Sequence, residues 1–279
     1  MTILLLLATV VITLAAAVRS TWSPCGLSML ASITPLSEIG RGHRYRTTAS
    51  WFVVGATLGG ATLGGAMAAL AGAVQAFSLT PQEVSAVALG AALVTVASDT
   101  GIGGFRLPVH HRQVNERWLD QFRPWVYGAG FGWQIGAGLA TYIVTAAVYL
   151  MMVLAALTGN GWLALGVGTL FGLVRGLSVC LGRRITSTDS FRSFHQWFSD
   201  LGPKIRRAVL AVEGVVVVLF AWTLAPWAAL GIAAAAVLWA APGVLRPARR
   251  RREPSVSVEP EAEEPAASQV GVRVSSRSE

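Results

Sequence analysis

One short stretch of the chain combines residue types that could carry chemistry inside a membrane. Ser23, Pro24, Cys25 and Gly26 interrupt an apolar run that extends from residue 2 to residue 36. A straight helix over that run would be roughly 50 Å long, whereas a bilayer core is about 30 Å thick. The helix must therefore tilt steeply or break. Because proline removes an amide donor and glycine tolerates unusual backbone angles, a break is expected at Pro24-Cys25-Gly26. Broken helices at membrane depth are tolerated where they line a cavity or are buried in protein. The stretch therefore indicates a site, with the Cys25 thiol as its reactive group.

The chemistry open to Cys25 is thiol–disulfide exchange, which needs a thiolate and a second thiol because it proceeds through a mixed disulfide. Arg19, helix-end amides or water entering the break would favour the thiolate. The alternative is an inert, buried cysteine that follows a kink. The second cysteine of the chain, Cys180, precedes Leu181-Gly182-Arg183-Arg184 and is the other redox candidate, again with an inert thiol as the alternative.

Four charged residues lie within the predicted spans: Arg19, Asp99, Arg175 and Glu213. Charges at membrane depth are costly and are usually paired or functional. We predict ion pairs between Arg19 and Asp99 and between Arg175 and Glu213. Such pairs would either hold neighbouring helices in register or line a path for an ion or solute that opens on the cytoplasmic side.

The remaining candidate groups indicate little chemistry. Pro24, Gln134 and Gly136 would line a solute cavity at the breaks of the first and fourth apolar runs. The four histidines fall in predicted loops with no cysteine or carboxylate cluster at ligand spacing, so we predict no metal site. The small residues of 59–65 suit helix contact better than phosphate binding. The sequence has no phosphate loop, catalytic triad or haem attachment motif, and we expect no cofactor.

Composition identifies the class of protein that must position these groups. Of the 279 residues, 53% are hydrophobic and only 13% are charged, and several uncharged runs exceed the length that spans a bilayer. We therefore predict a polytopic membrane protein of the plasma or inner membrane, in contact with the lipid bilayer. The net charge of +8 comes from short loops between spans, a distribution that excludes nucleic acid as the expected partner.

The apolar runs predict an all-α membrane bundle of about seven transmembrane helices within residues 1–245. The predicted spans are about 3–36, 51–74, 84–105, 125–158, 160–182, 207–224 and 227–245. Residues 183–206 are polar but carry aromatic side chains at helical spacing, which indicates a helix that lies on the membrane surface or packs on the bundle. Residues 246–279 are rich in Glu, Pro and Ser and are predicted to form a disordered cytoplasmic tail.

Loop charges predict the orientation of the spans. Lys and Arg occur after spans one, three, five and seven, and the loops after spans two, four and six contain none. Positively charged loops face the cytoplasm. We therefore predict an amino terminus outside the membrane and a carboxyl terminus in the cytoplasm.

Matches at an offset of 111 residues indicate an internal repeat. Trp22, Cys25 and Thr34 correspond to Trp133, Gly136 and Thr145, and the second span matches the fifth at the same offset. A duplicated unit of three spans places its copies in opposite orientations, as in inverted-repeat transporters with a site between the halves. The fold expected is two inverted three-helix repeats plus one extra C-terminal helix, with chance matching in a Gly- and Ala-rich chain as the alternative.

The Ser23-Pro24-Cys25 motif on a broken first helix, two three-helix halves and the Gly-Thr-Leu-Phe-Gly stretch at 168–172 resemble the CcdA/DsbD family of transmembrane thiol–disulfide transporters. The resemblance implies that Cys25 is the redox residue of the first half, that a thioredoxin-like protein is a partner, and that the protein moves reducing equivalents, for example in cytochrome c biogenesis. The sequence departs from the family at Gly136, which stands where the second redox cysteine would lie.

Two functions of different classes follow from the sequence. The first is thiol–disulfide exchange through Cys25, with an external partner supplying the missing thiol. The alternative is a small-solute or ion transporter or exporter on the same broken-helix scaffold, without redox chemistry. A third option is an assembly protein with no chemistry of its own.

Overall fold

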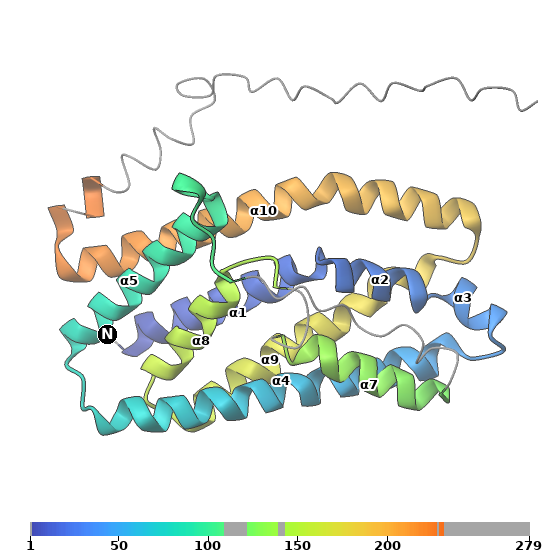
Figure 1. The fold of residues 1–279 in the computed structure, drawn as a ribbon, viewed down its shortest axis with the longest axis horizontal. Coiled ribbons are helices and arrows are strands. Elements are labelled where there is room, and N and C mark those ends of the chain that lie inside the picture. The colour runs from blue at the N-terminus through green and yellow to red at the C-terminus, as the bar shows by residue number, and fades with distance from the viewer. Residues whose placement is uncertain (1, 109–121, 139–142, 228, 232–279) are drawn as a thin grey trace, which may run out of the picture. The chain divides into compact units, whose positions relative to one another are not determined.

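The computed structural model describes residues 2–108, 122–138, 143–227 and 229–231, and within these ranges the protein is built from helices alone. The helices are α1 (Thr2–Thr21), α2 (Pro24–Ser32), α3 (Pro35–Gly40), α4 (Tyr45–Ala76), α5 (Pro81–Thr100), η1 (Ile102–Gly104), α7 (Pro124–Gly136), α8 (Ala147–Leu157), α9 (Gly161–Leu177), η2 (Ser178–Arg184) and α10 (Thr188–Leu224). Figure 1 shows their arrangement.

Five of the described helical segments are long and apolar enough to cross a membrane: Thr2–Thr21, Tyr45–Ala76, Pro81–Thr100, Gly161–Arg184 and Thr188–Leu224. With the shorter apolar helix α8, they make the chain an all-helical membrane protein. The predicted span 227–245 and the predicted tail 246–279 lie almost wholly outside the described residues, so a seventh helix remains a prediction.

The first apolar run is divided at the position that its sequence predicts. Helix α1 ends at Thr21, and the Ser23 hydroxyl caps α2 by accepting a hydrogen bond from the Gly26 amide at 3.1 Å. Pro24 occupies the first turn of α2, where its missing amide hydrogen costs nothing. A Cβ at Gly26 would overlap the Thr21 carbonyl, so only glycine fits at this break between α1 and α2.

The fourth apolar run is also divided. Its first part forms α7, which ends at Gly136, and its second part forms α8, which begins at Ala147. Each of the two long apolar runs that exceed the bilayer thickness is therefore built from more than one helix.

Two arrangements were predicted for residues 183–206, a helix on the membrane surface or a helix packed on the bundle, and the contacts of Phe198 agree with the second, although the helix is not a separate one. The residues from Thr188 onward continue without interruption into the predicted sixth span, forming the 37-residue helix α10 with Pro203 inside it. Phe198 is buried there and stacks on Trp22 at a ring separation of 4.4 Å, while the Trp22 indole N–H donates to the Phe198 carbonyl at 2.8 Å. These contacts, close to the turn that Pro203 disturbs, hold the amino-terminal half of α10 on the bundle.

Helix α4 packs against α7 and α9 through glycines (Figure 1). A Cβ at Gly55, Gly132 or Gly136 would overlap a backbone carbonyl of the facing helix, and the same holds at Gly60 and Gly172 on the α9 side. Small residues allow this close approach between membrane helices. The small residues of 59–65 are therefore helix-contact residues, as their spacing indicates, with Gly65 facing open space.

Candidate functional site

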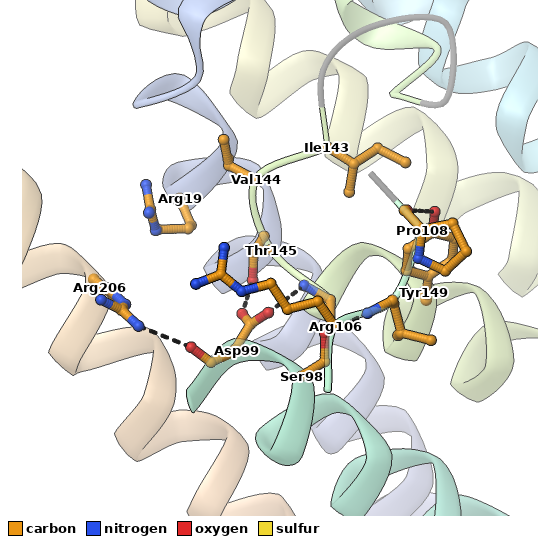
Figure 2. A pocket seen from close by; sticks show the side chains of 12 residues that line it. Arg19, Ser98, Asp99, Arg106, Pro108, Ile143, Val144, Thr145, Tyr149 and Arg206 are labelled. Atoms are coloured by element: carbon orange, nitrogen blue, oxygen red, sulfur yellow. Dashed lines mark hydrogen bonds between the residues drawn. The ribbon is translucent and has the colours of Figure 1, made fainter. Parts of the chain in front are cut away.

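A cavity of about 260 Å³ lies among α1, α5, α10 and the segment that precedes α8. Figure 2 shows its side chains, which come from segments far apart in the sequence. Its lining residues are Arg19, Ser98, Asp99, Arg106, Leu107, Pro108, Ile143, Val144, Thr145, Ala146, Tyr149 and Arg206. Two of the four charged residues predicted within spans, Arg19 and Asp99, are therefore brought together here.

Asp99 is anchored by two hydrogen bonds that cross from α5 to the start of α8. Its carboxylate accepts the Thr145 hydroxyl through one oxygen and the Ala146 amide, at 2.6 Å, through the other (Figure 2). The N-cap residue of α8 is Ala146, whose side chain cannot accept a hydrogen bond, so α8 has no side-chain cap from within its own segment. Asp99 therefore supplies negative charge to the amino-terminal end of α8 from another helix, an arrangement that the helix dipole favours.

Three arginines surround Asp99. Arg206 on α10 donates from one terminal nitrogen to the main-chain carbonyl of Asp99 at 2.9 Å, near the end of α5 (Figure 2). Arg19 interacts electrostatically with both Asp99 and Arg206. The predicted Arg19–Asp99 ion pair is wrong in its detail, because the one ion pair within 4 Å in the described part of the chain joins Arg41 to Glu38. Asp99 is instead held by neutral donors, and Arg19 remains at the cavity.

The predicted pairing of Arg175 with Glu213 is also wrong. Arg175 is 2% exposed and donates to the Ile135 carbonyl of α7, with its guanidinium 5.5 Å from the centre of the Phe171 ring. It also interacts electrostatically with Cys25. These partners belong to α7, α9 and α2, so Arg175 links the two broken runs to α9 and does not reach α10.

Glu213 is 0% exposed on α10, and neither carboxylate oxygen has a hydrogen-bond partner in the part of the chain that the structure describes. The charged group that interacts with it is Asp99. Helix α10 packs against α5 and α1, which explains why Glu213 meets the cavity side of the bundle and not α9. Glu213 and Asp99, two of the four charged residues predicted within spans, therefore lie close to one another.

The two cysteines occupy different environments. Cys25 is 1% exposed in an apolar cluster with Met29, Leu30, Phe52 and Phe131, whereas Cys180 is exposed in η2 beside a surface hollow lined by Leu181, Arg183 and Arg184. Neither cysteine forms a disulfide bond. Cys25 thus lies in the core at the helix break, and Cys180 lies on the surface.

Pro24, Gln134 and Gly136 do not line the cavity around Asp99. Pro24 is exposed at the start of α2, Gln134 is half-buried on α7, and Gly136 is packed against the backbone of Ala56. The binding role predicted for these three positions stays a prediction.

A buried cluster that sequence reasoning missed lies between α3, α4 and α7. The Glu38 side chain is 0% exposed, and its carboxylate accepts hydrogen bonds from Thr48 and Tyr127 and pairs with Arg41 at 3.3 Å. The His43 ring lies 6.3 Å from the Tyr127 ring. Glu38 lies between the predicted spans 3–36 and 51–74 and is not among the candidate residues predicted from the sequence. The Thr34-Pro35 helix start just before it was the signal that a further helix begins there.

Histidines and acidic residues do not gather into a metal centre within the described ranges, where no group of three or more His, Cys, Asp or Glu side chains could hold an ion. His110 and His111 lie outside these ranges. His195, predicted in a loop, lies on α10 and contacts Phe191 and Phe194.

Comparison with known proteins identifies relatives that share one name. The chain is 30% identical over 204 residues to the methylamine utilization protein MauF of Paracoccus versutus, which covers 69% of this chain and 68% of that protein. It is 32% identical over 167 residues to MauF of Paracoccus denitrificans, covering 58% of each chain. It is 28% identical over 179 residues to MauF of Methylophilus methylotrophus, covering 62% of this chain and 61% of the relative. No family profile and no solved structure matches the chain.

These relatives overturn the resemblance to the CcdA/DsbD family, which was wrong. The geometry at Gly136 gives a physical reason. A cysteine there would place its Cβ against the Ala56 carbonyl oxygen, so this packing has no room for the second thiol that a relay requires. The associated expectations of thiol–disulfide transport and cytochrome c biogenesis are not supported by the relatives' names.

Proposed function

The chain belongs to the family of the methylamine utilization protein MauF, and from this premise we propose that it is a membrane protein of methylamine utilization that binds and moves a small anion at the cavity around Asp99. The observation that carries the proposal is the charge of the cavity lining, where three arginines surround one carboxylate. This is the solute-transporter alternative of the sequence analysis, at a different place in the fold.

The arginines favour an anion because the protein's own acceptors leave guanidinium groups available to bind one. The Asp99 carboxylate is held by Thr145 and Ala146, and Arg206 donates to a main-chain carbonyl. Among the described residues, no hydrogen bond engages the guanidinium of Arg19 or Arg106. A planar guanidinium matches the geometry of a small oxyanion such as a carboxylate or sulfate and binds it through two parallel hydrogen bonds.

The size of the cavity favours a small solute. At about 260 Å³ it is smaller than the usual range of pockets for drug-sized ligands, which begins at about 300 Å³. The proposed substrate class is therefore a small oxyanion of a few non-hydrogen atoms. An alkylammonium cation would meet net positive charge at this site.

Helix packing supports an inverted repeat with the cavity near its centre. If residues 2–100 and 124–224 are the two copies, then α4 corresponds to α9, α5 to α10 and the α1 region to α7 and α8. Three pairs of counterparts pack against one another, α4 with α9, α5 with α10 and α1 with α8, whereas α7 packs on α4 and α9. A two-fold axis between the halves brings counterparts together in this way. Movement of one half against the other would then expose the cavity alternately.

The orientation that we propose keeps the amino terminus outside and the carboxyl terminus in the cytoplasm, with a seventh span at 227–245 and a cytoplasmic tail at 246–279. This arrangement places the end of α1 and the end of α5, which carry Arg19 and Asp99, toward the cytoplasm. The cavity would then be reached from the cytoplasmic side in the conformation described.

Anion binding to the purified full-length protein tests the proposal. Isothermal titration with sulfate and with acetate is expected to show binding, and titration with methylammonium chloride against sodium chloride is expected to show none. Arg19→Gln should weaken sulfate binding at least about tenfold, because a hydrogen bond to a charged group contributes about 1.5–3 kcal/mol.

The matched control is Arg44→Gln, which removes an exposed arginine at the start of α4, away from the cavity. Its sulfate affinity should equal that of the unmodified protein. Binding of methylammonium in place of the anions, or equal losses in both variants, would overturn the proposal.

A further inference from the structure

The Glu213 carboxyl is a buried titratable group that the anion site does not use. It lies on α10, which packs against α5 and α1, and it is absent from the cavity lining. Its two oxygens are buried and without hydrogen-bond partners in the described part of the chain. An ionised carboxylate in such a place is very costly, and buried groups of this kind take up a proton instead of remaining charged.

The charges facing Glu213 add to this cost. From α5 comes the Asp99 carboxyl, which is the charged group that acts on Glu213. Arg19 on α1 interacts electrostatically with Asp99 and with Arg206. Arg206 lies two turns before Glu213 on α10 and donates a hydrogen bond to the main-chain carbonyl of Asp99. Asp99 has donors and neighbouring arginines that stabilise its charged form, and Glu213 has none. When two carboxyl groups lie close together, the better-solvated one ionises and the other holds the proton.

We propose that Asp99 and Glu213 form a proton-binding pair that holds one proton at neutral pH, on Glu213, and takes up a second when an anion binds at the arginines. The proton is the ion that we propose, because the buried oxygens of Glu213 have no hydrogen-bond donor in the described part of the chain and Glu213 does not line the cavity around Asp99.

Coupling to the anion follows from competition for the arginines, and this part rests on the proposed function. An anion that engages Arg19 and Arg106 replaces Asp99 as their counter-charge and repels the Asp99 carboxylate. Asp99 then takes up a proton from the bulk solution, whose buffer supplies it, forming one new O–H bond. A singly charged anion and the proton together add no net charge, and a sulfate ion with the proton adds one negative charge in place of two, so proton uptake lowers the charge that the solute brings to membrane depth.

The proton on Glu213 is tested without any anion. Infrared spectroscopy of the full-length protein in lipid nanodiscs, titrated from about pH 5 to about pH 9, should show the carbonyl stretch of a protonated carboxylic acid at neutral pH. Glu213→Gln should remove that band while preserving side-chain size. The control Glu83→Gln changes an exposed carboxylate at the other end of α5 and should leave the band unchanged. A neutral-pH spectrum without the band, or a band that survives in Glu213→Gln, would overturn the proton pair.

The coupling is tested with sulfate, whose charge is constant over this range. Uptake of one proton on binding should tighten sulfate binding by up to tenfold for each unit that the pH falls. We expect sulfate to bind about tenfold more tightly at pH 6 than at pH 8, and Asp99→Asn to abolish this dependence. A pH-independent affinity in the unmodified protein would contradict the coupling. If sulfate does not bind at all, the anion site fails while the infrared result still decides the state of Glu213.

Discussion

The phenol oxygen of Tyr127 lies 2.7 Å from each of the two carboxylate oxygens of Glu38, across a sequence separation of 89 residues. This contact joins α3 to α7, and the Thr48 hydroxyl adds α4 to the same carboxylate. Because Glu38 is fully buried, these donors and Arg41 replace the water that it loses on folding. The cluster therefore holds three helices together at one end of the broken first run.

Tyr127→Phe should destabilise the protein by about 1–3 kcal/mol, because it removes one donor from a buried carboxylate and leaves its oxygens partly unsatisfied. Thermal unfolding in detergent measures the loss. Tyr149→Phe is the matched control, since its hydroxyl bonds to the Pro108 carbonyl at an exposed position. Equal melting temperatures for the two variants would show that the Glu38 cluster contributes little to stability.

Gly136→Ala should be destabilising by about 1–3 kcal/mol or more, because the added methyl group overlaps the Ala56 carbonyl and must push α7 away from α4. The same change at Gly166 on α9 meets open space and should be neutral or stabilising, since alanine favours a helix over glycine by about 1 kcal/mol. Comparing the thermal unfolding of Gly136→Ala with that of Gly166→Ala separates the effect of helix contact on stability from the effect of helix propensity. A tolerated Gly136→Ala would mean that α4 and α7 are further apart than described.

Asp99→Asn should bind sulfate about as tightly at pH 8 as the unmodified protein does at pH 6, because the amide mimics the protonated acid and leaves the arginines without a counter-charge. Titration calorimetry at both pH values measures this. A weaker affinity than that of the unmodified protein at pH 8 would show that Asp99 itself contacts the anion favourably.

Cys180 should react with a maleimide in the folded protein and Cys25 should not, because one thiol is exposed and the other is 1% exposed in an apolar cluster. A mass shift after labelling of membranes, with Cys25→Ser and Cys180→Ser as controls, distinguishes the two sites. Labelling of Cys25 without denaturant would reveal that the break at Pro24 opens to solvent.

Several structural features were predictable because their causes are local. Long apolar runs with few charges form helices of membrane length, and a proline followed by a glycine breaks a helix wherever the run is placed. The division of the first run at Ser23 follows from this. The helix α10 was predicted less well, because the charges at Lys204, Arg206 and Arg207 indicated a boundary. The structure continues the helix through them, with Phe198 packed on Trp22.

The sequence by itself determined the class of the protein and the helix break before Cys25, since hydropathy and backbone preference act over a few neighbouring residues. It also indicated that Arg19, Asp99, Arg175 and Glu213 lie in helices. Only the tertiary structure decided the partners of those charges. Asp99 binds Thr145 across 46 residues, Arg175 binds the Ile135 carbonyl across 40, and Glu213 is left beside Asp99. A buried polar group bonds to whatever donor or acceptor the packed helices bring within about 3 Å, and which helices meet depends on close contacts such as those at Gly60 and Gly136.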